Sequence, residues 1–369
     1  MKIAEVTSVD YSLRNFLLPL MRGMRERGHE VVGVCADGPL LDVPRAEGFR
    51  IVPVPMARSL DPRAQGRAFR ALLEVFRAER FDLVHGHNPI SGLLARAAAR
   101  RAGVPRVAYT CHGFLFNQPG PLWRRGLALG LEMMAGRLTD TFLTVSEEEA
   151  ADARRLRIHP RATAVGNGRD PTEFHPDPAV RAAVRAEIGT APDACVVVVV
   201  SRLVRHKGHP ELLRAMEEVP GAELWVVGDR LPTDHGEPLE PYFARAQAAM
   251  GPRLRRLGYR HDVARLLAAC DVFALPSHFE GLPMSVVEAM LTGLPVVATD
   301  VRGPREQVVE GETGFLVPPF ESERLAAVLR RLAGDAALRA RMGDAGRARA
   351  LERHTEAKVL ARTLDLLGL

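Results

Sequence analysis

The chain has 369 residues, which is long for one domain and comfortable for two domains of similar size. Apolar residues make up 47% and charged residues 26%, as in globular proteins, and no window is long and apolar enough to span a bilayer, so we expect a soluble protein unless it lies on a surface. The formal charge of +5 is uneven: residues 1–168 hold 24 Lys and Arg against 17 Asp and Glu, a net of +7, which leaves −2 for residues 169–369.

The positive charge of the first half indicates an anionic partner. We expect no nucleic acid, because the arginines lack interleaved aromatic residues and only 5% of the chain is aromatic; an anionic membrane surface or a phosphate-bearing acceptor fits better. The first residues, MKIAEVTSVDYS, show no cleavable signal pattern, so we expect a cytoplasmic protein, at most peripheral on the inner face of the membrane. The cysteines lack metal-ligand spacing and are expected to be reduced and buried. They are Cys35, Cys111, Cys195 and Cys270.

Short apolar runs alternate with amphipathic helical stretches from the first residue. A strand over KIAEVTSV precedes a helix near 12–28 and a strand over EVVGVCA, and later FDLVHGH, a helix near 90–102 and RVAYTCHG repeat the pattern. This alternation predicts βαβ units and a parallel sheet. After TDTFLTVS and ATAVGN, the stretch GRDPTEFHPDP is rich in Gly, Pro and Asp, which indicates a linker.

The alternation restarts beyond this linker. Further strands are expected over ACVVVVVSRL, AELWVVGD, RLRRLGY, DVFALPS and PVVATD. We therefore predict an α/β protein with two facing doubly wound, Rossmann-like domains, over residues 1–168 and 169–351, and a cleft between them. The tail from about 335 reads as helix, and residues from about 352 to 369 are expected to pack back on the first domain. Ligands of such sheets bind at the carboxyl ends of the strands, so the chemistry is expected on the loops there.

The most informative stretch is ALPSHFEGLPMSVVEAMLTGLPVVATD, residues 274–300. A loop after a strand carries Glu280 and Gly281, and Pro283 indicates the first turn of a helix over about 282–292. The free backbone N–H groups at the start of that helix suit a diphosphate, and Gly281 leaves room for its approach. These N–H groups lie near Leu282, Met284 and Ser285.

Glu288 lies eight residues past Glu280, roughly 10 Å along the helix, so one carboxylate can reach the sugar and the other the ribose. This spacing within FEGLPMSVVEAM resembles the Glu-x7-Glu signature of family-4 retaining glycosyltransferases, as in bacterial capsular and exopolysaccharide enzymes, and the similarity covers essentially the whole chain. The resemblance implies the GT-B fold and transfer of a sugar with retention of anomeric configuration. It implies a UDP-hexose or UDP-N-acetylhexosamine donor and a lipid-linked or growing glycan acceptor.

Other motifs follow the order that this family has. SRLVRHKG, residues 201–208, resembles the donor-phosphate loop, so Arg202 and Lys207 are candidate diphosphate ligands that would neutralise charge as the glycosidic bond breaks. VVGD and LGYRHDV resemble the loops near the nucleotide base. The donor-binding residues expected there are Gly228, Asp229, Tyr259 and Arg260.

In the first domain, YTCHGF places His112 at a strand end, where the family's matching histidine approaches the donor sugar. We expect His112 to orient the sugar and to stabilise positive charge at the anomeric centre. The resemblance also implies that a donor phosphate oxygen takes the proton of the attacking hydroxyl, so no dedicated base is needed. The family often has a Gly-Gly loop after the first strand, but this chain has SVDYSLRN. Acceptor-side candidates are Asp10, Ser12, Arg14 and His87.

A metal ion is not expected. His85 and His87 alternate in VHGHNP, but without a third ligand nearby in the sequence a cleft-lining or structural role is favoured. No two aspartates are two residues apart, so the Asp-x-Asp motif of metal-dependent glycosyltransferases is absent. We expect neither a metal nor another cofactor.

Three other functions fit less well. A sugar-nucleotide epimerase of similar fold binds the same ligand, but the sequence shows no carboxylates placed as acid and base across the cleft. A nicotinamide dehydrogenase needs a glycine-rich turn, which VDYSLR lacks. A subunit that only binds donor would not need Glu280, Glu288, Arg202 and Lys207 together.

The segment over residues 121–138 predicts a helix that is apolar almost all round, with only Glu132 interrupting it and Trp123 and two arginines at its start. Such a helix is either buried against the sheet or docked on a membrane. Further arginines on a preceding helix would add positive charge if they share its face. They are Arg63, Arg67, Arg70, Arg77 and Arg80.

Overall fold

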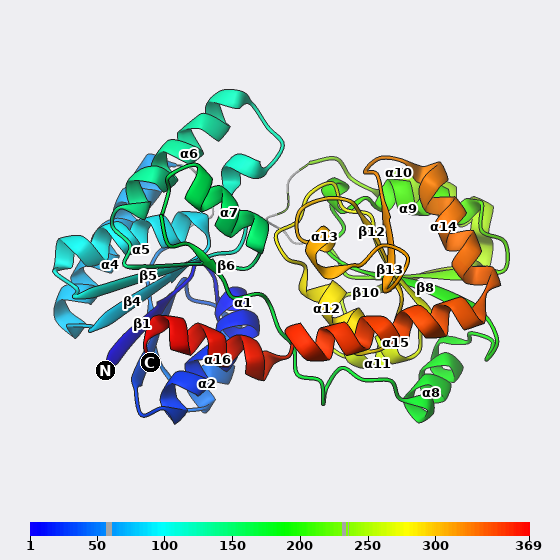
Figure 1. Cartoon of the computed structure of the whole chain (residues 1–369), viewed down its shortest axis with the longest axis horizontal. Helices are drawn as coiled ribbons and strands as arrows, with labels where there is room; N and C mark the ends of the chain where they lie inside the picture. The colour runs from blue at the N-terminus through cyan, green and yellow to red at the C-terminus, as the bar shows by residue number, and fades with distance from the viewer. Residues whose placement is uncertain (57–60, 231–233, 235) are drawn as a thin grey trace. The chain divides into compact units, whose positions relative to one another are not determined.

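The computed structural model describes all residues except 57–60, 231–233 and 235, and it contains two compact units, each built on one parallel sheet (Figure 1). Unit 1 comprises Met1–Gly166 with Lys358–Leu369, and unit 2 comprises Asn167–Ala357. The chain thus divides after Gly166, where the sequence placed the boundary after residue 168, and it returns to unit 1 at Lys358. In the described part of the chain, no helix has the length and apolarity that a membrane span needs.

Unit 1 has a seven-stranded sheet in the order β3-β2-β1-β4-β5-β6-β7, and the predicted βαβ alternation is confirmed there. The strands are β1 Lys2–Val6, β2 Glu30–Cys35, β3 Arg50–Pro53, β4 Leu83–His87, β5 Arg106–Cys111, β6 Thr141–Thr144 and β7 Thr163–Ala164. The α-helices are α1 Asp10–Ser12, α2 Leu18–Glu26, α3 Asp42–Ala46, α4 Pro62–Glu79, α5 Pro89–Ala102, α6 Leu122–Gly136, α7 Glu147–Arg155 and α16 Glu356–Leu367. A π-helical turn, Leu13–Leu17, joins α1 to α2 and divides the helix predicted near 12–28.

Helices cover both faces of this sheet. Helices α4 and α5 pack on the face that carries Ala4 and Val84, whereas α2 and α16 pack on the face that carries Ile3 and Leu83. Successive residues of a strand point to opposite faces, so Glu5 on β1 and the odd-numbered positions of β4 share the face of Ile3 and Leu83. Both faces are apolar, as a parallel sheet requires.

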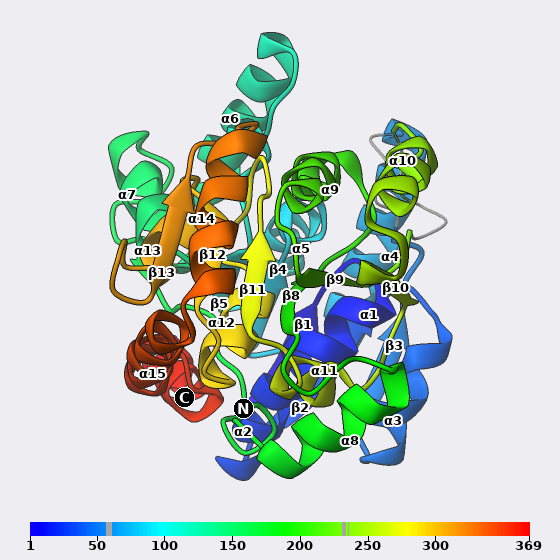
Figure 2. The same cartoon turned by 90° about the vertical axis from the view of Figure 1, so that its right-hand side faces the viewer.

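Unit 2 has a six-stranded sheet in the order β10-β9-β8-β11-β12-β13 (Figure 2). Its strands are β8 Cys195–Val200, β9 Ala222–Val227, β10 Leu254–Gly258, β11 Val272–Leu275, β12 Val296–Thr299 and β13 Gly314–Val317. Its helices are α8 Pro178–Ile188, α9 His209–Glu217, α10 Glu240–Met250, α11 Val263–Ala268, α12 Met284–Leu291, α13 Pro304–Gln307, α14 Ser322–Gly334 and α15 Ala336–Arg353. Helices α9, α10 and α14 cover one face, and α11 and α12 cover the other.

Two predicted boundaries need correction. The helix expected over 282–292 begins at Met284, because Pro283 has an extended backbone and forms the N-cap instead of the first turn. The helical tail is interrupted between α15 and α16, where Thr355 forms a parallel bridge with Arg169. Gly168 allows this close approach, since a Cβ there would lie 2.7 Å from the carbonyl oxygen of Thr355. The four cysteines are free and buried, as predicted.

Candidate functional site

Two loops meet at the carboxyl ends of β8 and β11 in unit 2. Gly208 ends the loop after β8 with φ +73°, and a Cβ there would lie 1.9 Å from the carbonyl oxygen of Pro276, so only glycine fits. The amide of His278 donates to the carbonyl oxygen of His206 over 2.8 Å, and the rings of His206 and Phe279 stack with centroids 4.7 Å apart. These contacts hold the loop that carries Lys207 against the loop that carries the first glutamate of the signature.

Lys207 and Glu280 form an ion pair between the two loops. The Lys207 ammonium donates to Oε1 of Glu280 over 2.7 Å, and the side chains are only 17% and 9% exposed. The structure thus brings together two of the predicted site residues. An ammonium and a carboxylate placed side by side match a ligand that carries both a phosphate and hydroxyl groups.

Helix α12 starts directly after this pair. Pro283 offers no side-chain cap, so the first N–H groups of the helix keep their capacity to bind an anion. Leu282 is buried, whereas Gly281, Met284 and Ser285 are partly accessible. An anion at this helix end would lie close to Glu280.

Glu288, two turns further along α12, is 7% exposed and its Oε1 accepts a hydrogen bond from Nε of Arg169 over 2.6 Å. Asn167 donates from Nδ2 to the carbonyl oxygen of Leu282 over 2.6 Å. The sequence predicted the linker but not these contacts. Asn167 and Arg169 lie more than a hundred positions before their partners, and no local pattern indicates that pairing.

In the part of the chain that the structure describes, Arg202 forms no hydrogen bond with Lys207; its guanidinium forms an ion pair with Asp234 and is 43% exposed. His209 fixes the backbone of Arg202. Burial lowers the pKa of His209 to about 4, so its ring is neutral at pH 7 and Nε2, 3.0 Å from the Arg202 carbonyl oxygen, donates to it. The loop is therefore tied to α9 at one end and to the loop after β11 at the other.

A second concave region lies at the carboxyl ends of β8, β9 and β10. Gly228 and Asp229 line a pocket of about 360 Å³. The other lining residues are Leu203, Val226, Arg256 and Gly258. Tyr259 is 51% exposed and Arg260 is bound to Asp262 by two hydrogen bonds of 2.7 and 2.8 Å, so neither of these predicted donor ligands lines the pocket.

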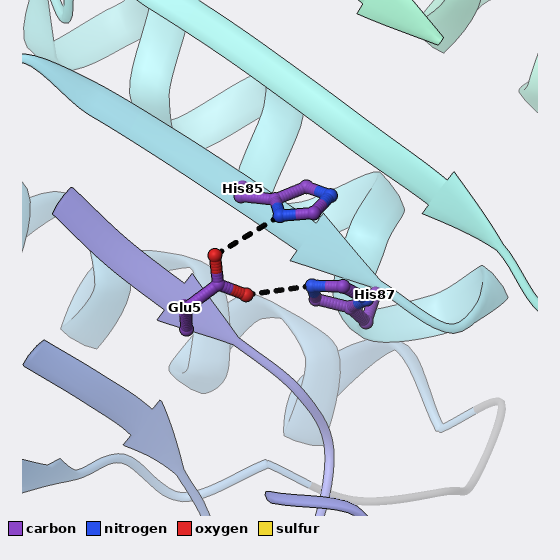
Figure 3. Close-up of side chains that lie close together, drawn as sticks. All are labelled: Glu5, His85 and His87. Carbon is purple, nitrogen blue, oxygen red and sulfur yellow. Dashed lines mark hydrogen bonds and ion pairs between the residues drawn. The ribbon is translucent and has the colours of Figure 1, made fainter. Parts of the chain in front are cut away.

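In unit 1, His112 follows β5 and is half-buried. Its Nε2 lies 3.1 Å from Nδ1 of His87, and Nε2 of His87 lies 2.7 Å from Oε2 of Glu5. Burial lowers the pKa of His87 to about 4 and that of His112 to about 3. Burial alone would raise the pKa of Glu5, but its contacts with His85 and His87 lower it to about 2. The cluster is therefore one ionised carboxylate that hydrogen-bonds two histidine rings (Figure 3).

The expectation that His85 and His87 lack a third ligand is wrong, because Glu5 supplies one from β1. One ligand atom of each residue lies within 4.8 Å of the others, and all three side chains are buried. The Glu5 oxygens lie 3.0 Å from Nδ1 of His85 and 2.7 Å from Nε2 of His87, which are hydrogen-bond distances. Glu5 is therefore hydrogen-bonded to both histidines, and the same three side chains are a candidate ligand set for a metal ion.

In the loop after β1, the side chain of Asp10 binds backbone amides of unit 1. The carboxylate of Asp10 accepts hydrogen bonds from the backbone amides of Tyr11 over 2.7 Å and of Leu40 over 3.3 Å. Ser12 is buried, and Arg14 is half-buried in the π-helical turn. The sequence predicted these residues as acceptor-side candidates. The carboxylate of Asp10 binds backbone amides within unit 1, in a chain that has SVDYSLRN where the family often has a Gly-Gly loop.

Helix α6 is not buried against the sheet along its whole length, which was one of the two alternatives that its sequence allowed. Glu132 points inward and pairs with the fully buried Arg96 over 2.9 Å, which anchors the second half of the helix. The first turns are exposed and stand clear of the sheet (Figures 1 and 2). Large apolar side chains are exposed along it: Leu122, Trp123, Leu127 and Met134. The helix is neither buried all round nor polar on its free side.

Solved structures share this architecture. Sucrose-phosphate synthase from Thermosynechococcus elongatus superposes with a TM-score of 0.86 at 20% identity, covering 100% of this chain and 98% of that one. Anabaena Alr3699/HepE in complex with UDP and glucose superposes with a TM-score of 0.83 at 22% identity, covering 100% and 99%. At such identities the likeness shows the fold, which is GT-B.

Sequence comparison shows the family. The model for Glycosyltransferase Family 4 matches residues 14–173, and the model for Glycosyl transferases group 1 matches residues 180–349. The putative glycosyltransferase EpsD of Bacillus subtilis (strain 168) is 31% identical over 99% of this chain and 96% of its own length. The UDP-Gal:alpha-D-GlcNAc-diphosphoundecaprenol alpha-1,3-galactosyltransferase of Escherichia coli is 29% identical over 83% and 80%. The chain belongs to the family-4 glycosyltransferases.

Proposed function

We propose that this glycosyltransferase transfers a hexose or N-acetylhexosamine from a UDP-sugar to a lipid-linked or growing glycan, with retention of configuration and without a metal ion. The observation that carries the proposal is the Lys207–Glu280 pair at the amino end of α12, with Glu288 on the same helix. The names of one relative and one solved structure support it. One names a UDP-galactose donor and a diphosphoundecaprenol-linked acceptor, and one neighbour was solved with UDP.

The chemistry follows from the charges around α12. A diphosphate at the helix end would meet the N–H groups near Met284 and Ser285 and the ammonium of Lys207. Lys207 would stabilise the charge that develops as the glycosidic bond breaks. Glu280 would then accept hydrogen bonds from hydroxyl groups of the sugar, and Glu288 would accept hydrogen bonds from the ribose hydroxyls. In this arrangement Lys207 does the work that a divalent cation does in metal-dependent transferases.

The nucleotide base is assigned to the pocket that Gly228 and Asp229 line. Gly228 lets β9 end close against the loop after β8, because a Cβ there would lie 2.0 Å from the carbonyl oxygen of Ser201. Tyr259 and Arg260 are given no role in this pocket.

A thermal-shift screen of nucleoside diphosphates and nucleotide sugars tests the donor. A ligand at a hundredfold its dissociation constant adds about 2.7 kcal/mol of stability to the state that binds it. We expect UDP and one UDP-sugar to raise the melting temperature, and GDP and ADP to raise it less. Equal shifts with all nucleotides would contradict the assignment of uridine.

Product analysis tests the reaction. Incubation of the donor with an undecaprenyl-diphosphate-linked sugar should give a product whose new linkage keeps the anomeric configuration of the donor, as read from its proton coupling constants. Activity should survive EDTA. Full loss in EDTA that Mg²⁺ or Mn²⁺ restores would contradict the metal-free mechanism, and conversion of donor to its epimer without acceptor would favour an epimerase.

We further propose that the exposed face of α6 lies on an anionic lipid surface, where a lipid-linked acceptor resides. Trp123, Leu127 and Met134 follow one another at helical spacing and are 65%, 56% and 60% exposed. Arg124, whose guanidinium lies 5.1 Å from the Trp123 ring, is exposed beside them. Apolar side chains next to cations are the signature of helices that lie in the headgroup region. The net charge of +7 in residues 1–168 favours the same surface.

A further inference from the structure

The start of α12 is held through its carbonyl groups instead of its N–H groups. Asn167 donates from Nδ2 to the Leu282 carbonyl oxygen over 2.6 Å, and Gln307 donates from Nε2 to the Pro283 carbonyl oxygen over 3.0 Å. An ordinary side-chain cap accepts a hydrogen bond from the second or third N–H of a helix and so occupies it. Proline as N-cap cannot do this, so the donors at this helix end stay available.

Gln307 belongs to a segment that packs closely against this loop. It is fully buried at the end of α13, and its backbone carbonyl oxygen accepts a hydrogen bond from Nε of Arg349 over 2.9 Å. Gly303, just before α13, has φ +85°, and a Cβ there would lie 1.9 Å from the Gly281 carbonyl oxygen, so only glycine fits. The backbone of α13 is therefore fixed directly beside the loop that carries Glu280, and this fixes the place of the Gln307 amide.

The two ends of the Gln307 amide are unequally used. Because a carbonyl oxygen only accepts, Nε2 must be the atom that faces Pro283, and this leaves Oε1 buried without a hydrogen-bond partner among the described residues. An unpaired buried oxygen costs free energy, which an apolar residue of similar size would avoid. An apolar residue cannot supply a donor to the Pro283 carbonyl group. The amide therefore serves the peptide group between Pro283 and Met284.

That peptide group carries the first N–H of the helix. In a trans peptide the C=O and the following N–H point in opposite directions, so the bond from Gln307 to the Pro283 carbonyl turns the Met284 N–H away from Gln307. The Pro283 carbonyl is also the first acceptor inside this eight-residue helix, so Gln307 reinforces a turn that is prone to fray. Within the described part of the chain, the N–H groups of Leu282 and Met284 donate no hydrogen bond.

We propose that Gln307 is a positioning residue that holds the Met284 N–H toward the diphosphate of the donor. Gln307 acts through the peptide group and does not itself touch substrate. The presence of a diphosphate at this helix end rests on the proposed function, whereas the role of Gln307 in orienting the peptide group does not.

UDP and uridine together test this role, because they differ only in the diphosphate. Gln307→Leu should weaken UDP binding about tenfold or more, as expected when a hydrogen bond to a charged group is impaired, and should leave uridine binding within about twofold of the parent. Thr190→Val is the matched control, since it removes a hydrogen bond of 2.7 Å to Glu223 at the amino end of β9, also from a buried position in unit 2. Unchanged UDP affinity in Gln307→Leu, or an equal weakening of UDP and uridine, would overturn the proposal.

Met284→Pro removes the N–H itself and tests whether Gln307 acts through it. The backbone allows this change, because the first position of a helix tolerates proline and Pro283 has the extended conformation, ψ 125°, that a residue before proline needs. In a Met284→Pro background, Gln307→Leu should cause little further loss of UDP affinity. In a Met284→Ala background, which keeps the N–H, it should again cost about tenfold. Equal losses in both backgrounds would show that Gln307 acts elsewhere and would overturn the proposal.

Labelling of methionine with ¹⁵N separates this proposal from the proposed function. The 11 methionines give few amide signals, and Met284→Ala identifies that of Met284. If UDP does not shift this signal in the parent, the diphosphate lies elsewhere and the proposed function is contradicted. The residual dipolar coupling of the Met284 N–H, which reports its direction without any ligand, still decides the role of Gln307. It should change in Gln307→Leu and not in Thr190→Val, and an unchanged coupling in Gln307→Leu would overturn the proposal.

Discussion

The ammonium of Lys207 donates to Oε1 of Glu280 across 73 positions of sequence, at the amino end of a helix that lacks a side-chain cap. Each partner limits the freedom of the other before any ligand binds. A preorganised cation does not have to be reoriented when charge develops on a leaving group, and that is the condition under which such a cation accelerates a reaction most.

Lys207→Ala should therefore lower kcat by a factor on the order of a hundred or more, with a smaller change in the affinity for UDP. Glu280→Ala should leave the binding of free UDP nearly intact and reduce turnover, since its expected partner is the sugar. The matched control is Arg205→Ala in the same turn, whose guanidinium pairs with Glu211 over 2.8 Å and not with Glu280. Calorimetry with UDP and initial rates with the donor measure both effects, and a Lys207→Ala enzyme with parental kcat would refute the role of the cation.

Glu288 and Arg169 give a second prediction. Arg169 binds Oε1 of Glu288, which leaves the other oxygen for a ribose hydroxyl. Glu288→Ala should weaken UDP binding by about 1.5–3 kcal/mol, as expected for a lost hydrogen bond to a charged acceptor. Arg169→Ala should weaken it less, and the two effects should not add, because Arg169 acts through Glu288.

Calorimetric titration of the two single variants and the double variant with UDP measures this coupling. Glu312→Ala, which removes an exposed carboxylate of unit 2, is the control and should bind as the parent does. If Glu288→Ala bound UDP with the affinity of the parent, Glu288 would not be the residue that binds the ribose.

The sequence predicted the fold well because the signals for it are local. Apolar runs of β8, β9 and β11 are each buried, and each is followed by a helix with its own periodicity, so the parallel sheets could be inferred without any long-range information. Glu280 and Glu288 could be placed on one helix for the same reason. The distance between these two glutamates follows from the rise of the helix and does not depend on contacts between distant segments.

What escaped prediction depends on pairing between distant segments. Glu5 lies 80 positions before His85, and only the strand order β1-β4 brings them together. Glu132 reads as an interruption of an apolar helix until Arg96 is found opposite it. The ion pair of Arg260 with its neighbour Asp262 was also not predicted. Periodicity predicts the face on which a side chain lies, but it does not predict which charged residue of a distant segment lies opposite that side chain.

The buried histidines predict how stability depends on pH. Burial lowers the pKa of His209 from 6.5 to about 4, so the unfolded chain takes up a proton between these values and the folded chain does not. The free energy of unfolding of unit 2 should therefore fall as the pH drops from about 6.5 to about 4, and His209 should contribute up to about 1.4 kcal/mol per pH unit in that window. The same sign holds for His87 and His112 in unit 1, whose pKa values are also lowered by burial.

Urea unfolding followed by the fluorescence of Trp225, which is fully buried in unit 2, measures this slope. His209→Gln keeps a donor for the Arg202 carbonyl but does not titrate, so its slope between pH 6 and pH 5 should be shallower than that of the parent by about 1.4 kcal/mol per pH unit at most. His175→Gln, at a partly exposed position, is the control. An unchanged slope in His209→Gln would mean that other groups carry the acid sensitivity.

The free face of α6 gives the last prediction. The parent should float with anionic vesicles at low salt and not with neutral vesicles, because its arginines contribute about 1 kcal/mol each near an anionic surface, and the attraction weakens as salt shortens the Debye length. Trp123→Ala with Leu127→Ala should abolish flotation by removing apolar area, and Arg124→Glu should abolish it by reversing charge. Arg125 is left unchanged, since its Nε donates to the carbonyl oxygen of Phe116 over 2.8 Å and its loss would disturb the start of the helix. Phe320→Ala removes an equally exposed aromatic side chain from unit 2 and should float as the parent does. If the parent stays unbound with anionic vesicles at low salt, the apolar face of α6 has another partner, and a soluble glycan becomes the better candidate for the acceptor.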